Sequence, residues 1–474
     1  MIREIVKNWE IQATGDPFVD TGGMVIEYFQ KKYPEKSIFQ LIEMVTDIYI
    51  KNWDNNLHTF FLNSSITHNS NKGQKGINKT IALYKGFLEG KEPDGKEAEE
   101  GFCRITGQFG KVFNGSRDNH IMSGSGTLIN FHHGFEMGIK LSKEALISIL
   151  FVPLGVEQLG DKVAILSSNI DDVSRFFIYK NIENNLKDIA SGISKAIQRS
   201  DFSNPTNALF DYATQCIENI KIATYDDENE KSNTKGVTLN LFHFTNFSSQ
   251  VSINLYELPS NVFGFYAYCY TKYKSEWLNF IFHYYSSSKF KNAVFDNLTN
   301  TWTNNKENVD YHTFRLWKNK IYEMLVRGQP LHKIFLKHSQ KHKLNFKIVE
   351  LYQINIQKMD KRTLLKIKDL ANFIVNERSD DEIKKSMTRL NGAKSSHELR
   401  YILLKFLGTN YNEGKEKPLF TIEDYAEYLF PDGSNWREMR DLVLIAVYQK
   451  LHEANIKVGV ELIENVLDNQ SNEN

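Results

Sequence analysis

The stretch Gly101–Gly155 organises the rest of the chain and reads GFCRITGQFGKVFNGSRDNHIMSGSGTLINFHHGFEMGIKLSKEALISILFVPLG. Near its start, Cys103-Arg104-Ile105-Thr106-Gly107 has the form C-x-x-C-G with a hydroxyl in place of the second sulfur. Near its end, Ser142-Lys143-Glu144-Ala145 has the spacing of a second pair without either sulfur. Tetrahedral zinc needs four thiolate or imidazole ligands, commonly in such paired spacings. With only one thiol left, we expect the scaffold to persist without a metal.

Two ligand pairs on such a scaffold are typical of a zinc ribbon, so we predict a degenerate zinc-ribbon-like region over residues 101–155. The alternative is an ordinary loop and helix around a buried Cys103. His133 and Glu136, with His132 beside them, have a spacing that suits one helix face, but the sequence offers no third ligand nearby. We therefore expect these side chains to be structural.

Length and composition limit the classes of protein to which the chain can belong. A chain of 474 residues usually holds two or more domains. Lys and Arg (58) equal Asp and Glu (58), so any nucleic-acid surface must be local. Three cysteines without a framework suit a reducing cytoplasm. The most apolar run, residues 145–156, is too short to span a bilayer. These features predict a soluble cytoplasmic protein.

The N-terminal part mixes helical and strand patterns. Residues 38–53 have a helical apolar period, and Gly22-Gly23 precedes a predicted helix that begins at Met24. Such a glycine pair forms either a simple turn or a phosphate-binding helix start. A strand is expected at residues 162–167, and a strand pair within residues 237–258. The aromatic-rich segment 263–295 is interpreted as core.

The C-terminal quarter reads as a helical bundle. Helical periods run from Leu364 to Ile374 and from Leu399 to Leu407, with Gly408 as the predicted end of the second. Thr421 with Asp424 predicts a capped helix start, and Asn435 predicts the cap of the last helix. We therefore divide the chain into an N-terminal α+β domain, 1–345, and a C-terminal helical bundle, 346–474.

Charge is distributed unevenly along the second half. Residues 312–378 hold fifteen Lys and Arg against five acids, whereas residues 412–474 hold thirteen acids and six bases. A dense basic segment is typical of nucleic-acid binding, and the alternative is a solvated helix surface.

A polar segment, residues 63–80, is the main candidate for binding DNA. It contains no acid and reads as a loop, in which lysines suit phosphates and amides suit base edges. The candidate residues there are Lys72, Gln74, Lys75, Asn78 and Lys79. The alternative is a solvated surface loop.

A second polar loop, within residues 113–130, offers Arg117 and Asn119 as competing base contacts. No catalytic motif is present, so we expect a chain that is not an enzyme. Arg327 and His332 fit the loose R-x4-H pattern of HEPN ribonucleases, but Pro330 would break the helix that must carry both side chains.

Several segments resemble one CRISPR family. The N-terminal WEIQATGDPFVDTGG (9–23) is similar to the opening of the large subunit of type I-B Cascade complexes of the Tneap subtype, a family named for its paired C-x-x-C motifs. Further similar segments are Asn130-Phe131 with Gly138, Val152–Gly155, Phe420–Tyr425 and Asn435–Arg440. The missing thiols depart from the family pattern and speak against zinc.

The resemblance implies a non-catalytic large subunit, and because too few ligands remain for zinc we expect no cofactor. It implies recognition of the protospacer-adjacent motif in target double-stranded DNA by the N-terminal domain, and handling of displaced DNA by the bundle. The implied partners are guide CRISPR RNA, the Cascade backbone subunits and a helicase-nuclease recruited in trans. In this family the bundle resembles the small subunit, which suggests an internal start at Met359. The alternatives are an HEPN-like ribonuclease and a standalone single-strand nucleic-acid-binding protein.

Overall fold

The fold is α+β with a helical C-terminal region, as predicted. The computed structural model describes Trp9 and the ranges 13–53, 57–62, 64–124, 135–220, 236–244, 252–431 and 435–457. None of the helices in these ranges is both long enough and apolar enough to cross a membrane.

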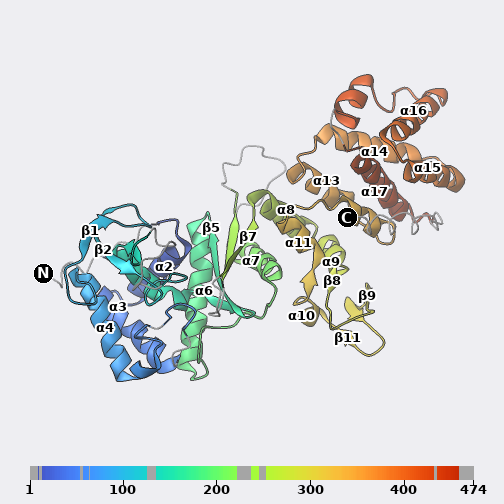
Figure 1. The fold of residues 1–474 in the computed structure, drawn as a ribbon. Coiled ribbons are helices and arrows are strands. Elements are labelled where there is room, and N and C mark those ends of the chain that lie inside the picture. Colours follow the sequence, from blue (N-terminus) through green and yellow to red (C-terminus); the bar gives the residue numbers. More distant parts are fainter. Residues whose placement is uncertain are drawn as a thin grey trace. The chain divides into compact units, whose positions relative to one another are not determined.

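The chain forms two compact units (Figure 1). Unit 1 comprises Met1–Ile222 and Val237–Ser260, and unit 2 comprises Ala223–Gly236 and Asn261–Asn474. The predicted boundary at residue 345 lies inside unit 2, in the connection between two of its helices. The separate C-terminal bundle, 346–474, therefore stays a prediction.

Unit 1 combines helices with two antiparallel sheets. Its helices are α2 (Pro17–Lys32), α3 (Ile38–Asp47), η1 (Ile48–Asn52), η2 (Asn69–Asn71), α4 (Gln74–Glu89), α5 (Lys143–Phe151), η4 (Val152–Gly155), α6 (Asp171–Ala190) and α7 (Pro205–Asn219). Its strands are β1 (Glu99–Phe102), β2 (Phe109–Gly115), β3 (Ile139–Leu141), β4 (Glu157–Leu159), β5 (Lys162–Ser168), β6 (Leu239–Phe244) and β7 (Ile253–Leu258).

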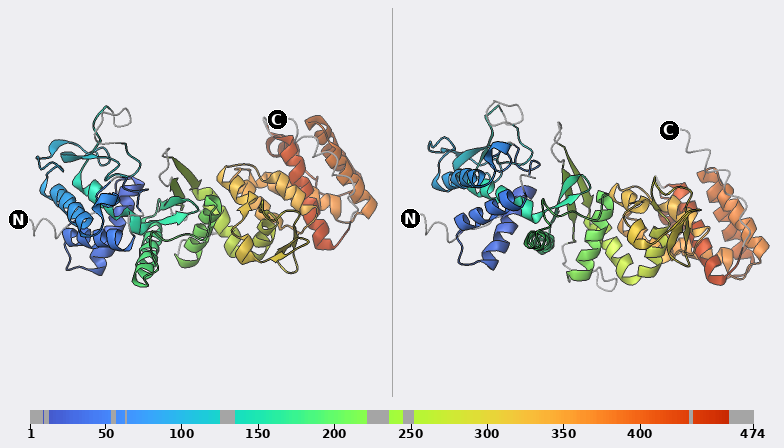
Figure 2. Two further views of the ribbon diagram at one scale, coloured as in Figure 1. Left: turned by 60° about the horizontal axis from the view of Figure 1, so that its bottom comes forward. Right: turned by 90° about the horizontal axis from the view of Figure 1, so that it is seen from below.

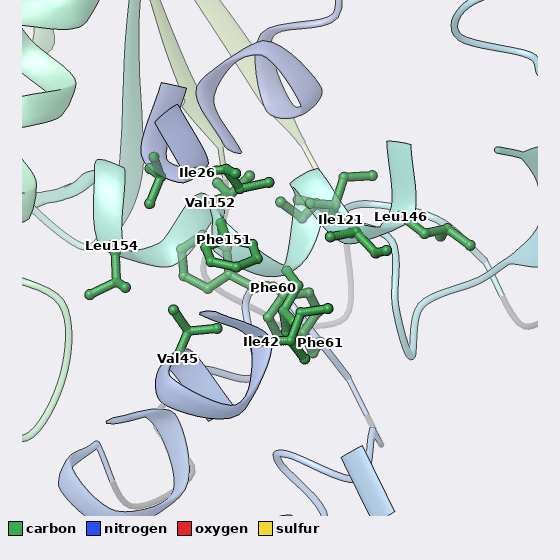
Figure 3. Close-up of a cluster of buried hydrophobic side chains, with 14 of the residues drawn as sticks. Ile26, Ile42, Val45, Phe60, Phe61, Ile121, Leu146, Phe151, Val152 and Leu154 are labelled. Carbon is green, nitrogen blue, oxygen red and sulfur yellow. The ribbon is translucent and has the colours of Figure 1, made fainter. Parts of the chain in front are cut away.

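The apolar run after Ser142 forms the centre of unit 1. Every residue from Ala145 to Val156 is buried, because α5 and η4 lie inside a cluster that α2, α3 and the segment with Phe60 and Phe61 surround (Figure 3). Tyr49 adds a buried hydrogen bond to this core, in which its hydroxyl donates to the Leu150 carbonyl at 2.8 Å. The stretch that organises the sequence therefore also organises the core.

The Gly22-Gly23 pair lies inside α2, and the prediction that it precedes a helix is wrong. Asp16 caps α2 by accepting from the Phe18 and Val19 amides, so the helix begins at Pro17. A Cβ on Gly22 would lie 1.8 Å from the Ser148 carbonyl oxygen in α5. This glycine therefore serves a close helix–helix approach, and it forms neither a turn nor a phosphate site.

The two sheets of unit 1 are arranged differently. One has the order β1-β2-β3, and the other has the order β4-β5-β6-β7. In the second sheet, α6 packs on β5, while α7 packs on β6 and β7 (Figure 1). The predicted strand at 162–167 and the predicted pair within 237–258 are confirmed, with Leu239 opposite Leu258.

Unit 2 is mostly helical. Its helices are α8 (Ser260–Lys272), α9 (Lys274–Phe282), α10 (Tyr311–Phe314), α11 (Lys320–Val326), α12 (His332–Ser339), α13 (Phe346–Asn355), α14 (Lys361–Val375), α15 (Asp380–Gly392), α16 (Ser396–Asn412), η5 (Asp424–Leu429) and α17 (Trp436–Ala454). Its short strands are β8 (Tyr285–Ser286), β9 (Val294–Asp296), β10 (Thr301–Thr303), β11 (Asn308–Val309) and β12 (Lys318–Asn319).

The aromatic-rich segment 263–295 is core, as predicted. Trp277 and Phe265 are fully buried and meet edge to face at 5.5 Å, and Phe265 also contacts Tyr352 in α13 at 5.8 Å. The last helices form a cluster, drawn in orange to red, in which α17 packs against α12, α14, α15 and α16 (Figure 2).

The helix ends of this cluster test the capping predictions. The Thr421 and Asp424 side chains each accept from the other residue's amide, at 3.1 and 2.9 Å, and Asn435 caps α17. Both caps are confirmed. The predicted stop at Gly408 is wrong, because α16 continues to Asn412 with Gly408 on its exposed side.

Candidate nucleic-acid interface

The two half-sites of the degenerate ribbon meet in space. Thr106 donates its amide to Cys103 Sγ at 3.5 Å, within the turn between β1 and β2. Burial raises the pKa of the Cys103 thiol, but hydrogen bonds from Thr106 and from the Ser142 and Ile105 amides outweigh burial and lower it. Cys103 of the first pair thus lies near Ser142 of the second, and the ribbon-like region stays a prediction.

The residues at the predicted second ligand pair, and Glu136, have structural roles. Ser142 caps α5 by accepting from the Ala145 amide at 3.3 Å. Glu136 pairs with Arg104 at 3.3 Å, and His132 and His133 lie outside the described residues. Within the part of the chain that the structure describes, no group of three or more His, Cys, Asp or Glu side chains is placed to hold a metal.

The segment 64–80 is not the loop that the sequence predicts. From Gln74 onward it is helix α4, and Asn69–Asn71 forms the short turn η2 before it. The reason is burial of Ile77, Thr80, Tyr84 and Phe87 along one face of α4. The polar residues of the predicted loop are therefore the exposed face of a helix start.

The predicted DNA contacts gather at this end of α4. The side chains of Lys72, Gln74, Lys75, Asn78 and Lys79 are all exposed. The first turn contains no acid, and Gly73 caps the helix without a side chain, so backbone amides and lysines carry the positive charge here. Lys72 and Lys75 make no ion pair with any carboxylate of the described residues.

The local fold holds this surface rigidly. A Cβ on Gly76 would lie 2.0 Å from the Asn71 carbonyl oxygen, so only glycine permits η2 to fold against α4. Lys79 donates to Asn71 Oδ1 at 2.9 Å, and the Ser65 and Thr80 hydroxyls meet at 2.7 Å. Gln74 Nε2 donates to Asn78 Oδ1 at 2.9 Å, which makes the two amides one unit.

Arg117 and Asn119 lie together in a separate turn after β2. Asn119 is only 5% exposed, and its Oδ1 accepts from the Ser116 amide at 2.8 Å. Its buried position favours a role in holding the turn. Arg117 is half-buried, and its amide donates to the Gly124 carbonyl at 2.9 Å.

Part of the positive charge of the basic segment 312–378 lies in ion pairs within the fold. Arg362 pairs with Asp424 and Glu423, both at 3.0 Å, and Arg378 pairs with Glu413 at 2.6 Å. These contacts join the basic segment to the acidic segment that follows it. These two arginines therefore form ion pairs within the fold, while Lys333 and Lys337 remain exposed on α12.

The sequence reasoning missed a basic surface on α15 and α16. Residues 383–412 contain six Lys and Arg (Lys384, Lys385, Arg389, Lys394, Arg400 and Lys405) and one acid, Glu398, after the three acids in the first turn of α15 (Asp380, Asp381 and Glu382). All six basic side chains are exposed. A count over this window would have found the surface, but residues 383–412 fall between the two segments whose charges were compared.

The HEPN-like pattern is not assembled. Arg327 is exposed at the end of α11, whereas His332 is 7% exposed in the first turn of α12, 3.8 Å from Asp441. Pro330 separates the two helices, as the sequence argument requires.

One buried acid in unit 1 has a strongly shifted pKa. Burial raises the pKa of Glu157 in β4 to about 7, although Lys180 and a hydrogen bond with Ser200 oppose the shift. The Tyr212 hydroxyl of α7 donates to the same carboxyl group. This hydrogen bond connects α7 to β4, the edge strand of the four-stranded sheet. Neither residue is near the predicted DNA contacts in the sequence.

Comparison with known proteins adds one match. Residues 337–474, which run from α12 to the C-terminus, match the family model of the DevT C-terminal domain. No curated protein matches the chain.

Proposed function

We propose that this chain is the non-catalytic large subunit of a type I-B CRISPR surveillance complex, which acts in antiviral defence. In this role it recognises the protospacer-adjacent motif in target double-stranded DNA, stabilises the R-loop and helps recruit a helicase-nuclease. The match of residues 337–474 to the DevT C-terminal domain carries the proposal, because DevT is a Cascade-associated protein. The meeting of the two degenerate ribbon halves at Cys103 supports it from the other end of the chain.

The proposed partners are guide CRISPR RNA, the Cascade backbone subunits and target DNA. In such complexes the guide reads the target by base pairing, while protein reads the short adjacent motif. A small subunit made from an internal start at Met359 belongs to the same proposal. Such a product would keep Asp360, the cap of α14, but would lack α12 and α13, which pack on α17.

The exposed start of α4 is the proposed contact with the duplex. Lys72 and Lys75 suit phosphates, since they carry no ion pair with the described carboxylates. Gln74 and Asn78 suit base edges, because side-chain amides pair with adenine. Arg117 is the competing contact, and Asn119 positions its turn.

Substitutions on α4 test this contact. Lys72→Ala and Lys75→Ala should weaken target binding for all flanking motifs and reduce the salt slope by about 1 each, because each removes one phosphate contact. Gln74→Ala or Asn78→Ala should cost about 1–3 kcal/mol with the correct motif and relax motif preference. Since the two amides are hydrogen-bonded, the double variant should cost little more than either single variant.

Binding of labelled duplexes with correct and incorrect motifs to the assembled complex measures these effects. Lys85→Ala, near the other end of α4, is the matched control and should leave binding unchanged. If the Lys72–Asn78 variants bind and discriminate like the parent chain, the surface is only a solvated helix start.

A further inference from the structure

The four-stranded sheet of unit 1 has two different edges. At one edge, backbone covers β4, because the Gln158 amide donates to the Gln198 carbonyl and the Ser200 amide donates to the Gln158 carbonyl, both at 2.8 Å. At the other edge lies β7, whose partner among the described strands is β6 (Figure 1). In the described part of the chain, no backbone hydrogen bond reaches Ile253–Leu258 from the side away from β6. This side of β7 is therefore an open edge.

The side chains of β7 form an anchored face and an exposed face. Leu258 is buried, and Tyr256 is half-buried with its ring 6.3 Å from that of His243 in β6. On the other face, Ile253 and Leu255 are 43% and 49% exposed. The fold thus holds β7 through one face and leaves two apolar side chains of the other face in solvent.

The strand also lacks the features that protect edge strands from pairing. Natural proteins blunt such edges with lysine, proline, inward-pointing charges or bulges. The strand Ile253–Leu258 reads INLYEL, without lysine or proline, and its six residues pair with β6 in one continuous register. A partner strand would add main-chain hydrogen bonds along this edge and would pack on the exposed apolar side chains.

Glu257 determines which strand fits the edge. It is exposed on the same face as Ile253 and Leu255, and it forms no ion pair within the described residues. A cation in the added strand would satisfy it, because opposite charges directly across a sheet attract. A second copy of β7 fits less well, since INLYEL contains no cation and Glu257 would face an apolar side chain or another glutamate.

We propose that the open edge of β7 binds an extended segment of a partner protein, which adds a strand to the sheet. The segment has apolar side chains opposite Ile253 and Leu255, and a lysine or arginine opposite Glu257. This contact goes beyond the proposed function, because it involves neither the start of α4 nor a nucleic acid.

The test uses the full chain and a capped, fluorescent peptide of sequence Arg-Thr-Val-Thr-Val-Thr. Antiparallel to β7, this peptide places its arginine opposite Glu257 and its valines opposite Leu255 and Ile253. Fluorescence anisotropy should show saturable binding, and hydrogen exchange should show protection of amides in Ile253–Leu258. Glu257→Lys should lower the affinity about fivefold and should instead favour a peptide with glutamate in place of arginine.

Further variants separate the side-chain and backbone contributions. Ile253→Thr/Leu255→Thr keeps β-forming residues but removes apolar surface, so the affinity should fall about tenfold. Peptides that are N-methylated at alternate residues lose hydrogen bonding along one edge only. One of the two alternations should abolish binding and the other should preserve it, because only one edge of the added strand faces β7.

Ile193→Thr is the matched control, since Ile193 is 70% exposed in unit 1 outside the sheet and its loss should leave binding unchanged. A parent chain that does not bind the peptide, equal binding by Ile253→Thr/Leu255→Thr, or two N-methylated peptides that behave alike would overturn the proposal. So would a parent chain that sediments as a dimer and becomes monomeric in Ile253→Thr/Leu255→Thr, because β7 would then pair with a second copy.

Discussion

Gly22→Ala should unfold unit 1 or lower its free energy of unfolding by at least about 3 kcal/mol. The new methyl group would lie 1.8 Å from the Ser148 carbonyl oxygen and 2.4 Å from its carbon, both in the backbone of α5. A backbone cannot rotate aside like a side chain, so α2 and α5 must separate. Because α5 is buried from Ala145 to Phe151, that separation would open the core of the unit.

Gly264→Ala is the matched control for this substitution. Gly264 lies within α8, and a Cβ there would have no heavy atom within 4 Å. Alanine should therefore stabilise unit 2 by about 0.5–1 kcal/mol through helix propensity. Thermal unfolding, with hydrogen exchange in α2 and α5, measures both effects. Unchanged protection of these helices in Gly22→Ala would show that the close helix approach is wrong.

Unit 2 should lose stability in mild acid because of three histidines whose rings lie against one another. The His338 ring lies 4.9 Å from that of His342 and 5.1 Å from that of His283, and the His283 and His342 rings are 4.1 Å apart. Burial, followed by the neighbouring histidines, lowers the pKa of His338 to about 3, and burial followed by His342 lowers that of His283 to about 4. The buried Nε2 atoms of His338 and His283 have no hydrogen-bond partner among the described residues.

The direction in which stability changes with pH follows from these pKa values. The unfolded chain takes up protons near pH 6.5, whereas His283 and His338 stay neutral in the folded chain until about pH 4. Stability is therefore full above pH 6.5 and is lost as the pH falls toward 4. At pH 5 the loss is about 2 kcal/mol for each of His338 and His283.

Variants of the cluster isolate this effect. His338→Phe removes one titrating ring from a site already lined by Phe280 and Tyr284, and should reduce the loss between pH 7.5 and pH 5 by about 2 kcal/mol. His397→Gln, an exposed residue of α16, should leave the pH dependence unchanged. Hydrogen exchange in α9 and α12 at both pH values measures the loss. An equal loss in His338→Phe and the parent chain would contradict the assignment to this cluster. The other charged neighbours, Lys341 and His452, are present in every variant and cannot mimic the difference.

The sequence predicts the elements whose signals are local. The alternation of Val237, Leu239 and Leu241 indicates β6, because these side chains are buried on one face of the sheet, whereas Ile253 and Leu255 of its partner β7 are 43% and 49% exposed. Likewise, the Asn435 cap and the Thr421–Asp424 cap depend on neighbours within three residues. Such features need no knowledge of the rest of the fold.

Features that depend on distant contacts were not predictable in this way. Nothing near Gly22 in the sequence indicates that α5 passes within touching distance of it. Gly408 looks like a helix end, but α16 continues because Asn410 in the next turn is buried and donates to the Lys417 carbonyl at 3.0 Å. The start of α4 reads as a loop because its two buried aromatic residues, Tyr84 and Phe87, lie beyond the polar segment.

The candidate site also combines features that the sequence predicts with features that only the structure shows. Composition alone singles out the lysines and amides at residues 72–79, but only the structure shows that they share one exposed helix start. The charge count over 312–378 cannot show that Arg362 and Arg378 pair with acids more than thirty residues away in the sequence. It also omits the α15–α16 surface, whose cations lack such partners.

Purification of the tagged full-length chain from the cells that make it, with sequencing of the bound RNA, tests the central proposal most directly. A subunit of a surveillance complex should co-purify with its backbone partners and with RNA of one uniform length that shares flanking sequences and varies between them. A chain that purifies alone, or with RNA of mixed length and unrelated sequence, would contradict the assignment to a CRISPR surveillance complex and favour a standalone single-strand-binding protein.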